Sequence, residues 1–294
     1  MVTPFTANGD IDLNAAEKIA EHIVSNGACL FALGTTGEAA SISYSAKAQF
    51  VETVVKKNAH RTFVFAGISD NCLATSMELA KQFFDLGVDV VVAHVPSYYL
   101  LTGDDVLSYY ETLAERAAGP LMLYNIPTTT GVSIPLEVID QLSHISIIIG
   151  LKDSVNDIDR AKKAIALWKD REDFSYLMGC ASLSKTALAI GADGIVPSVG
   201  NIVPDLFVKL YNAVLNGDLD QAEQYQKRAD SISDIFQKNR NLSQALPILK
   251  AVMHVLGFCE PKVLPPLRDL TADQIQALKE TVNDTHLLQK DQSP

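Results

Sequence analysis

The stretch Ile147-Ile148-Ile149-Gly150-Leu151-Lys152-Asp153-Ser154 decides how the rest of the chain can be interpreted. Its run of aliphatic residues, rich in β-branched isoleucine, is typical of a strand that is buried on both faces of a parallel sheet. Lys152 follows at the carboxyl end of that run, where its ammonium group would be poorly solvated. Burial disfavours the charged form of a lysine and lowers its pKa, which makes a free amine available near neutral pH.

A neutral amine in an apolar pocket is the kind of group that attacks a ketone to form a Schiff base. The stretch by itself also allows a second interpretation, in which Lys152 only marks the solvent end of a strand. The choice between a nucleophile and a solvent-facing lysine therefore depends on the remainder of the chain.

The composition restricts the classes of protein to which the chain can belong. The 294 residues carry a net charge of −11 without a cluster of lysine and arginine, which argues against nucleic acid as a partner. The four cysteines lack CxxC spacing and the six histidines lack HxxxH or HExxH spacing, so we expect neither a disulfide framework nor a metal site. The start MVTPFTANGD has no signal-peptide pattern and no apolar run is long enough to span a membrane, so we expect a cytoplasmic protein without membrane contact.

Strand-like and helical segments alternate over the first 217 residues. Eight strand-like runs lie near residues 2–3, 30–33, 63–66, 88–92, 121–124, 147–151, 176–178 and 194–196. Strict alternation implies parallel strands with right-handed crossovers, and eight such units in roughly 220 residues predict an α/β fold of the TIM (β/α)8 barrel type. The first run is unusually short, so either this strand is frayed or the true start lies upstream of Met1.

The alternation stops after Asn216-Gly217-Asp218, and three helical stretches follow at about 219–238, 243–257 and 272–287. We therefore expect two regions, a barrel over residues 1–217 and a C-terminal helical extension over residues 218–294. Residues 289–294 are expected to form a frayed tail.

Residues with catalytic potential fall at the carboxyl ends of the predicted strands, where TIM-barrel enzymes carry their active sites. The stretch GTTGE at 34–38 follows the second strand, and its backbone N–H groups and hydroxyls suit a carboxylate, although a plain glycine-rich turn is the alternative. Tyr98 and Tyr99 follow the fourth strand, either as packing residues or as functional groups. Tyr124 ends the fifth strand, where its phenol either relays protons or hydrogen-bonds a neighbouring loop.

Five motifs occur together in a characteristic order and spacing, namely GTTGE at 34–38, PSYY at 96–99, YNIP…TG at 124–131, GLKDS at 150–154 and GADGIVPSVGN at 191–201. With these motifs, essentially the whole chain resembles the dihydrodipicolinate synthase/N-acetylneuraminate lyase family of pyruvate-dependent class I aldolases. The resemblance implies a TIM-barrel enzyme that forms a Schiff base with pyruvate and needs no metal or organic cofactor. It also implies a homotetramer built from dimers.

The resemblance further implies roles for individual residues. Lys152 would form the imine with the ketone carbon of pyruvate or another 2-oxo acid, and Tyr124 would shuttle protons. Thr35 and Thr36 would hold the carboxylate of that acid. Tyr99, or its neighbour in the same loop, would reach across a subunit interface to complete a proton relay with Thr36.

The half of the site that faces the second substrate departs from the best-known members of the family. Gly179 and Val196 lie where the family lines the pyruvate site. Dihydrodipicolinate synthases carry an arginine two residues after the proline of YN-x-P, but here that substrate-binding position is Thr129, which cannot make a bidentate charged contact with a carboxylate. Sialic acid lyases and several sugar-acid aldolases carry an acidic pair after the glycine that matches Gly179, where this chain has Cys180 and Ala181.

These differences favour an aldolase that reversibly cleaves a 4-hydroxy-2-oxo acid, of the 2-keto-3-deoxy acid or 4-hydroxy-2-oxoglutarate type, into pyruvate and an aldehyde. Dihydrodipicolinate synthase, which condenses pyruvate with aspartate semialdehyde, is the alternative enzyme. A catalytically silent barrel that binds a 2-oxo acid is the alternative of another class. The combined presence of two threonines, a phenol and a lysine at the strand ends argues against the silent barrel, because a binding protein has no need for a desolvated amine.

Overall fold

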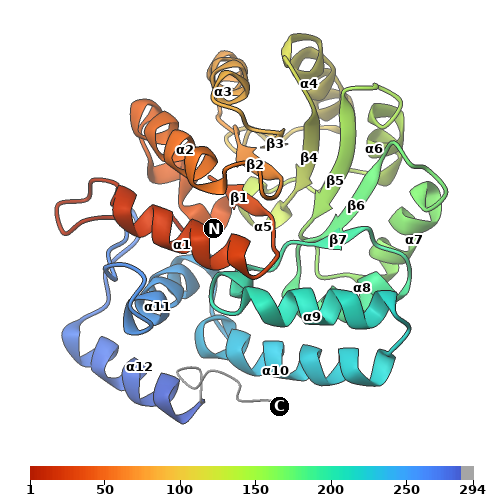
Figure 1. Ribbon diagram of the computed structural model, residues 1–294. Helices are drawn as coiled ribbons and strands as arrows, with labels where there is room; N and C mark the ends of the chain where they lie inside the picture. Colours follow the sequence, from red (N-terminus) through yellow and green to blue (C-terminus); the bar gives the residue numbers. More distant parts are fainter. Residues whose placement is uncertain (286–294) are drawn as a thin grey trace.

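The computed structural model describes residues 1–285, so residues 286–294, with the predicted tail, lie outside the described part. Seven parallel strands form one curled sheet in sequential order, with helices around its outside (Figure 1). The predicted α/β barrel fold is confirmed. The strands are β1 (Leu30–Ala32), β2 (Val64–Gly67), β3 (Val90–His94), β4 (Leu121–Asn125), β5 (Ile148–Asp153), β6 (Ser175–Met178) and β7 (Gly194–Ile195).

Helices alternate with the strands, as parallel pairing requires, and most of them bury one apolar face. In the first of them, Asp12 accepts a hydrogen bond from the backbone of Ala15, and Ile19 and Ile23 are buried. The helices up to the end of the barrel are α1 (Leu13–Ser25), α2 (Tyr44–Asn58), α3 (Leu73–Asp85), α4 (Gly103–Arg116), α5 (Pro127–Thr130), α6 (Leu136–Leu142), α7 (Ile158–Trp168), α8 (Ser184–Ala189) and α9 (Pro204–Leu215).

The strand predicted at residues 2–3 does not form, and the prediction of eight strands is wrong in this respect. Val2 donates its backbone N–H to the side chain of Asn201 at 2.8 Å instead of to a neighbouring strand. Phe5 makes only an isolated bridge with Ile11. Within residues 1–285, the edges of β1 and β7 are not hydrogen-bonded to each other.

Alternate strand residues fill the interior of the curled sheet. Val90, Val92 and Met122 are buried there, and Phe31 and Phe65 pack against them. A cavity of about 480 Å³ lies between the β1 and β7 edges and extends to Lys152. The interior is therefore apolar up to the level of the lysine.

Three helices follow the barrel, α10 (Leu219–Gln237), α11 (Leu242–Val255) and α12 (Ala272–Asp284), close to the ranges predicted from the sequence. Capping boxes built on Asn241 and Thr271 begin the last two. Helix α10 packs along α9, and α11 contacts both α10 and α12 (Figure 1). Within residues 1–285, no helix is both long and apolar enough to cross a membrane.

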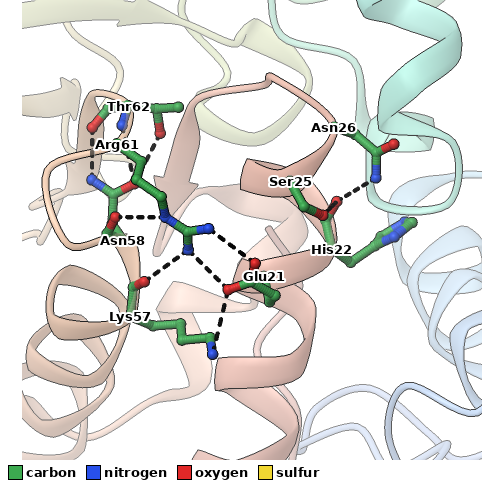
Figure 2. Close-up of polar contacts among 8 residues, drawn as sticks. All are labelled: Glu21, His22, Ser25, Asn26, Lys57, Asn58, Arg61 and Thr62. Atoms are coloured by element: carbon green, nitrogen blue, oxygen red, sulfur yellow. Dashed lines mark hydrogen bonds and ion pairs between the residues drawn. The ribbon is translucent and has the colours of Figure 1, made fainter.

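Exposed ion pairs join the outer surface of α1 to the last turn of α2 and to the loop that follows it (Figure 2). Arg61 donates from its two terminal nitrogens to the carboxylate of Glu21 at 2.9 and 2.8 Å, and Lys57 lies 3.3 Å from the same carboxylate. The hydrogen bonds from Arg61, helped by Lys57, lower the pKa of Glu21 to about 2. Because these groups are solvated, they orient the two helices and add little to stability.

A buried ion pair instead connects α11 to the loop after β1. Lys250 contacts the carboxylate of Glu38, and both side chains are 1% exposed. Lys250 also donates to the carbonyl of Thr3 at 2.7 Å, and Glu38 accepts from the backbone N–H of Leu264 at 3.1 Å. Both charges are thus paired and hydrogen-bonded, which is the condition for keeping them in an apolar core.

Replacing Lys250 by methionine would leave the Glu38 carboxylate buried without its counter-charge. We expect Lys250→Met to lower the free energy of unfolding by about 3–5 kcal/mol. The control Lys262→Met breaks the more exposed pair with Asp269 at 2.7 Å and should cost about 1 kcal/mol or less. Urea denaturation followed by circular dichroism measures both, and equal losses would contradict a special role for the buried pair.

Candidate active site

Three interior side chains stand in one row at the carboxyl ends of β3, β4 and β5. The register pairs His94 with Tyr124, and Tyr124 with Lys152. Side chains that are paired in register on neighbouring strands point to the same face of the sheet. The lysine and the phenol that were predicted from separate motifs therefore meet inside the barrel.

Lys152 lies against aromatic faces. Its Nζ atom is 3.9 Å from the ring centroid of Tyr124 and 4.7 Å from that of Phe31. The residue is 7% exposed, and none of the ion pairs within residues 1–285 includes it. A solvent-facing lysine at the end of a strand would show the opposite pattern, so that interpretation is wrong.

The hydroxyl of Tyr124 is the centre of the polar contacts around the lysine. It lies 3.4 Å from Oγ1 of Thr35 and also contacts Ser154 and Lys152. Burial raises the pKa of Tyr124, but the Lys152 ammonium and the hydrogen bonds with Thr35 and Ser154 outweigh it and hold that pKa below its usual value. A phenol with a lowered pKa exchanges its proton more readily near neutral pH.

The loop after β1 presents the two threonines in an unusual turn. Leu33 and Glu38 on either side of them both have φ near 55°, a conformation that is uncommon for residues other than glycine. Between them, Thr35–Gly37 forms one 3₁₀ turn, which carries Thr35 to the Tyr124 hydroxyl. A Cβ atom on Gly67 would lie 2.1 Å from the Leu33 carbonyl oxygen, so only glycine lets β2 pass this close to the loop.

Gly179 and Val196 follow β6 and β7 on the other side of Lys152. A Cβ atom on Gly179 would lie 2.1 Å from Oγ of Ser154, so this glycine leaves room for the serine that contacts Tyr124. Val196 lines the same cavity as Lys152. The structure therefore places Val196 on the cavity that Lys152 lines, and Gly179 against Ser154.

Two predicted residues lie apart from this group. Thr129 in α5 is exposed, and its hydroxyl donates to the carbonyl of Ile126 at 3.2 Å. Tyr99 is 70% exposed, and its ring packs edge-on against that of Tyr98, with 5.1 Å between the centroids. Within one chain, Tyr99 therefore does not complete a relay with Thr36.

A polar network on the opposite face of β4 and β5 was missed by the sequence analysis. Asn125 donates to Asp153 at 3.0 Å, and Arg160 donates to the other carboxylate oxygen of Asp153 at 2.8 Å. Asn125 and Asp153 are also paired in register. Because successive strand residues face opposite sides, the network stands directly behind Tyr124 and Lys152 and fixes the ends of their strands. The sequence did contain a signal for this network. In each of the pairs Tyr124-Asn125 and Lys152-Asp153, the second residue must face the side of the sheet opposite to the first, so Asn125 and Asp153 could have been expected to meet there.

Ser154 and His94 were also missed. Ser154 is the last residue of the GLKDS motif, but nothing in the motif shows that its side chain turns toward Tyr124. His94 was set aside with the other histidines because none has metal-site spacing. Its place beside Tyr124 depends on strand register, which the sequence does not state.

A barrel with a buried lysine among a phenol and hydroxyls at the carboxyl ends of its strands has the site of a Schiff-base lyase. The sequence profile of the dihydrodipicolinate synthetase family matches residues 1–285 of the chain. The chain belongs to this family. It is thereby an enzyme, a carbon–carbon lyase of the aldolase type that acts through a lysine Schiff base.

Individual relatives agree with this assignment. The 4-hydroxy-tetrahydrodipicolinate synthase of Oceanobacillus iheyensis is 31% identical over 285 residues, which cover 97% of this chain and 95% of the relative. The solved dihydrodipicolinate synthase of Bacteroides thetaiotaomicron superposes with a TM-score of 0.91 at 29% identity, covering 97% of this chain and 96% of that one. YagE, a prophage protein of the family from E. coli K12 solved in complex with pyruvate, gives a TM-score of 0.90 at 25% identity, with 97% and 96% covered.

The names of the relatives bear on the choice of reaction. They favour the synthase, which was the alternative, over the aldolase of 4-hydroxy-2-oxo acids that was preferred from the sequence. That preference rested on the absence of an arginine at position 129, on the small uncharged Cys180 and Ala181 after Gly179, and on the GLKDS motif.

The space that Gly179 leaves for Ser154 provides a test of the site geometry. We expect Gly179→Ala to displace Ser154 from Tyr124 and to lower the rate of imine formation with pyruvate about 100-fold, since displacements of about 1 Å have such effects. Gly200→Ala is the matched control, because its Cβ would make only ordinary contacts, with Pro197 at 3.5 Å and Phe207 at 4.0 Å. Stopped-flow trapping of the imine measures both rates. A Gly179→Ala variant as fast as the control would contradict this geometry.

Proposed function

We propose that Lys152 is the residue that forms the imine with the ketone carbon of pyruvate. The observation that carries this proposal is the burial of its amine against the ring of Tyr124, 3.9 Å away, without an ion pair in residues 1–285. A protonated imine is an electron sink, which stabilises the enamine that forms when the C3–C4 bond breaks or the C3 proton leaves.

Tyr124 then moves protons during imine formation and during the carbon–carbon step. Its lowered pKa and its contacts with Thr35 and Lys152 support this role. Thr35 and Thr36 hold the carboxylate of pyruvate through the backbone N–H groups and hydroxyls of their 3₁₀ turn. Val196 and the backbone at Gly179 line the opposite side of the bound acid.

Borohydride reduction in the presence of pyruvate tests the role of Lys152. We expect peptide mass mapping to find a pyruvyl adduct on Lys152, because borohydride converts an imine into a stable secondary amine. Lys152→Ala should give no adduct there, and Lys81→Met should keep it, since Lys81 is an exposed lysine on α3. A folded protein without an adduct would contradict the proposal, and the silent 2-oxo-acid-binding barrel would then be the better account.

The second substrate is an aldehyde, and two reactions remain as candidates. The names of the relatives support condensation of pyruvate with aspartate semialdehyde, which makes the synthase the leading candidate. One residue of this chain supports reversible cleavage of a 4-hydroxy-2-oxo acid instead. Thr129 stands where the synthases have arginine, and its hydroxyl is engaged with the carbonyl of its own helix turn, at Ile126.

Thr129→Arg separates these candidates. If the arginine is the element that this chain lacks, we expect the substitution to raise kcat/KM for aspartate semialdehyde at least tenfold, because a bidentate guanidinium–carboxylate contact is a strong charge-assisted hydrogen bond. Thr129→Lys is the control with the same charge but without the fork geometry. A wild-type enzyme that already condenses aspartate semialdehyde efficiently, and gains nothing from either change, would exclude the aldolase of 4-hydroxy-2-oxo acids.

We further propose a homotetramer built from dimers, in which Tyr99 serves the site of another subunit. The exposure of three neighbouring apolar side chains, Tyr98 at 79%, Tyr99 at 70% and Leu100 at 88%, supports a covered surface at this loop. Light scattering over a dilution series, combined with activity measurements, provides the test. We expect activity to fall as the oligomer dissociates, and full activity in a stable monomer would contradict a donated tyrosine.

A further inference from the structure

One polar group beside the proposed nucleophile has no role in the mechanism so far. His94 ends β3, in register with Tyr124, and shares the interior face of the barrel with Val90 and Val92. Its ring lies 6.1 Å from that of Tyr124, centroid to centroid, in an edge-on arrangement. The imidazole therefore stands on the side of Tyr124 that faces away from Lys152, at the same level of the barrel.

The contacts of the ring determine its tautomer. Nδ1 lies 2.8 Å from the carbonyl oxygen of Val95. A carbonyl oxygen can only accept, so the proton of the neutral ring is on Nδ1 and the lone pair of Nε2 is available as an acceptor. Nothing in residues 1–285 donates a hydrogen bond to Nε2.

The surroundings keep the ring neutral. Burial lowers the pKa of His94, and the hydrogen bond with the Val95 carbonyl opposes this in part. The nearby Lys152 and Lys47 ammonium groups lower the pKa further. No carboxylate among the described residues acts on the imidazole in the opposite sense. Nε2 is therefore an available acceptor on the interior face of the barrel.

Both candidate reactions give the bound molecule a hydroxyl donor on the carbon two bonds beyond C2. When the enamine attacks an aldehyde, the new C3–C4 bond turns the aldehyde oxygen into a hydroxyl on C4, and cleavage starts from the same hydroxyl. Lys152 holds C2 of this molecule, so C4 lies two bonds farther along the chain. A buried acceptor that a hydroxyl can satisfy discriminates strongly against an analogue without that hydroxyl.

We propose that Nε2 of His94 accepts a hydrogen bond from the C4 hydroxyl of the bound aldol, which makes His94 a substrate-binding residue for the aldehyde half. This inference rests on the proposed imine at Lys152. It holds for the synthase and for the aldolase alike, because both handle a 4-hydroxy compound.

Two ligands that differ only in this hydroxyl, 4-hydroxy-2-oxoglutarate and 2-oxoglutarate, provide the test. Both are trapped on Lys152 with borohydride over a range of concentrations, and the half-saturating concentration is taken from the total adduct. We expect the wild-type protein to favour the hydroxylated acid at least tenfold. His94→Asn, whose amide can replace Nδ1 but not Nε2, should abolish this preference by weakening only the hydroxylated acid.

His94→Gln carries an acceptor in place of Nε2 and should restore the preference to within about threefold of wild type. His144→Asn, a change at an exposed histidine, should behave as wild type. The inference is overturned if the wild-type protein shows no preference, if the asparagine variant keeps it, or if the glutamine variant loses as much as the asparagine variant. If pyruvate itself is not trapped on wild-type Lys152, the proposed function is overturned, and this inference with it. If pyruvate is trapped but the protein shows no preference for the hydroxylated acid, only this inference is overturned.

Discussion

The arrangement of the site depends on one irregularity in the pairing of β4 with β5. Leu121 pairs with Ile148, but Met122 pairs with Gly150, so Ile149 is an extra residue on β5. Beyond this bulge, Lys152 is opposite Tyr124, and both point into the barrel. If the register of Leu121 with Ile148 continued without a bulge, Lys152 would pair with Asn125 and face the outer side of the sheet. A bulge next to an active site that redirects a side chain is a recurrent device in β-structure.

The turn that carries Thr35 and Thr36 is stabilised by residues that lie outside the site. The threonine turn contains two residues at positive φ, and such a backbone persists only where its surroundings fix it. Glu38 ends this turn, and its carboxylate is bound by Lys250 of α11 and by the backbone of Leu264. The C-terminal helices are thus connected to the carboxylate-binding loop through a buried ion pair. Their contribution to the site is to hold the turn in place.

Much of the fold and the central residues of the site could be predicted from the sequence. Continuous apolar runs and the alternation of segments are local properties of the chain, and they identified seven of the strands and the helices after the barrel. The bulge at Ile149, the partnership of Glu38 with Lys250 and the position of His94 beside Tyr124 depend on register and on long-range packing, which local patterns do not contain. The predicted first strand failed for a related reason, because strand formation needs backbone partners that Val2 does not find.

The most direct test of the imine at Lys152 is the exchange of the pyruvate methyl protons with solvent. In D2O, an enzyme that forms the imine and its enamine replaces these protons by deuterium, without any need for an aldehyde. Proton NMR should show the methyl signal of pyruvate disappearing with catalytic amounts of the wild-type protein and persisting with Lys152→Arg. A methyl signal that persists with the folded wild-type protein, or that disappears equally fast with the variant, would contradict the assignment of Lys152 as the nucleophile.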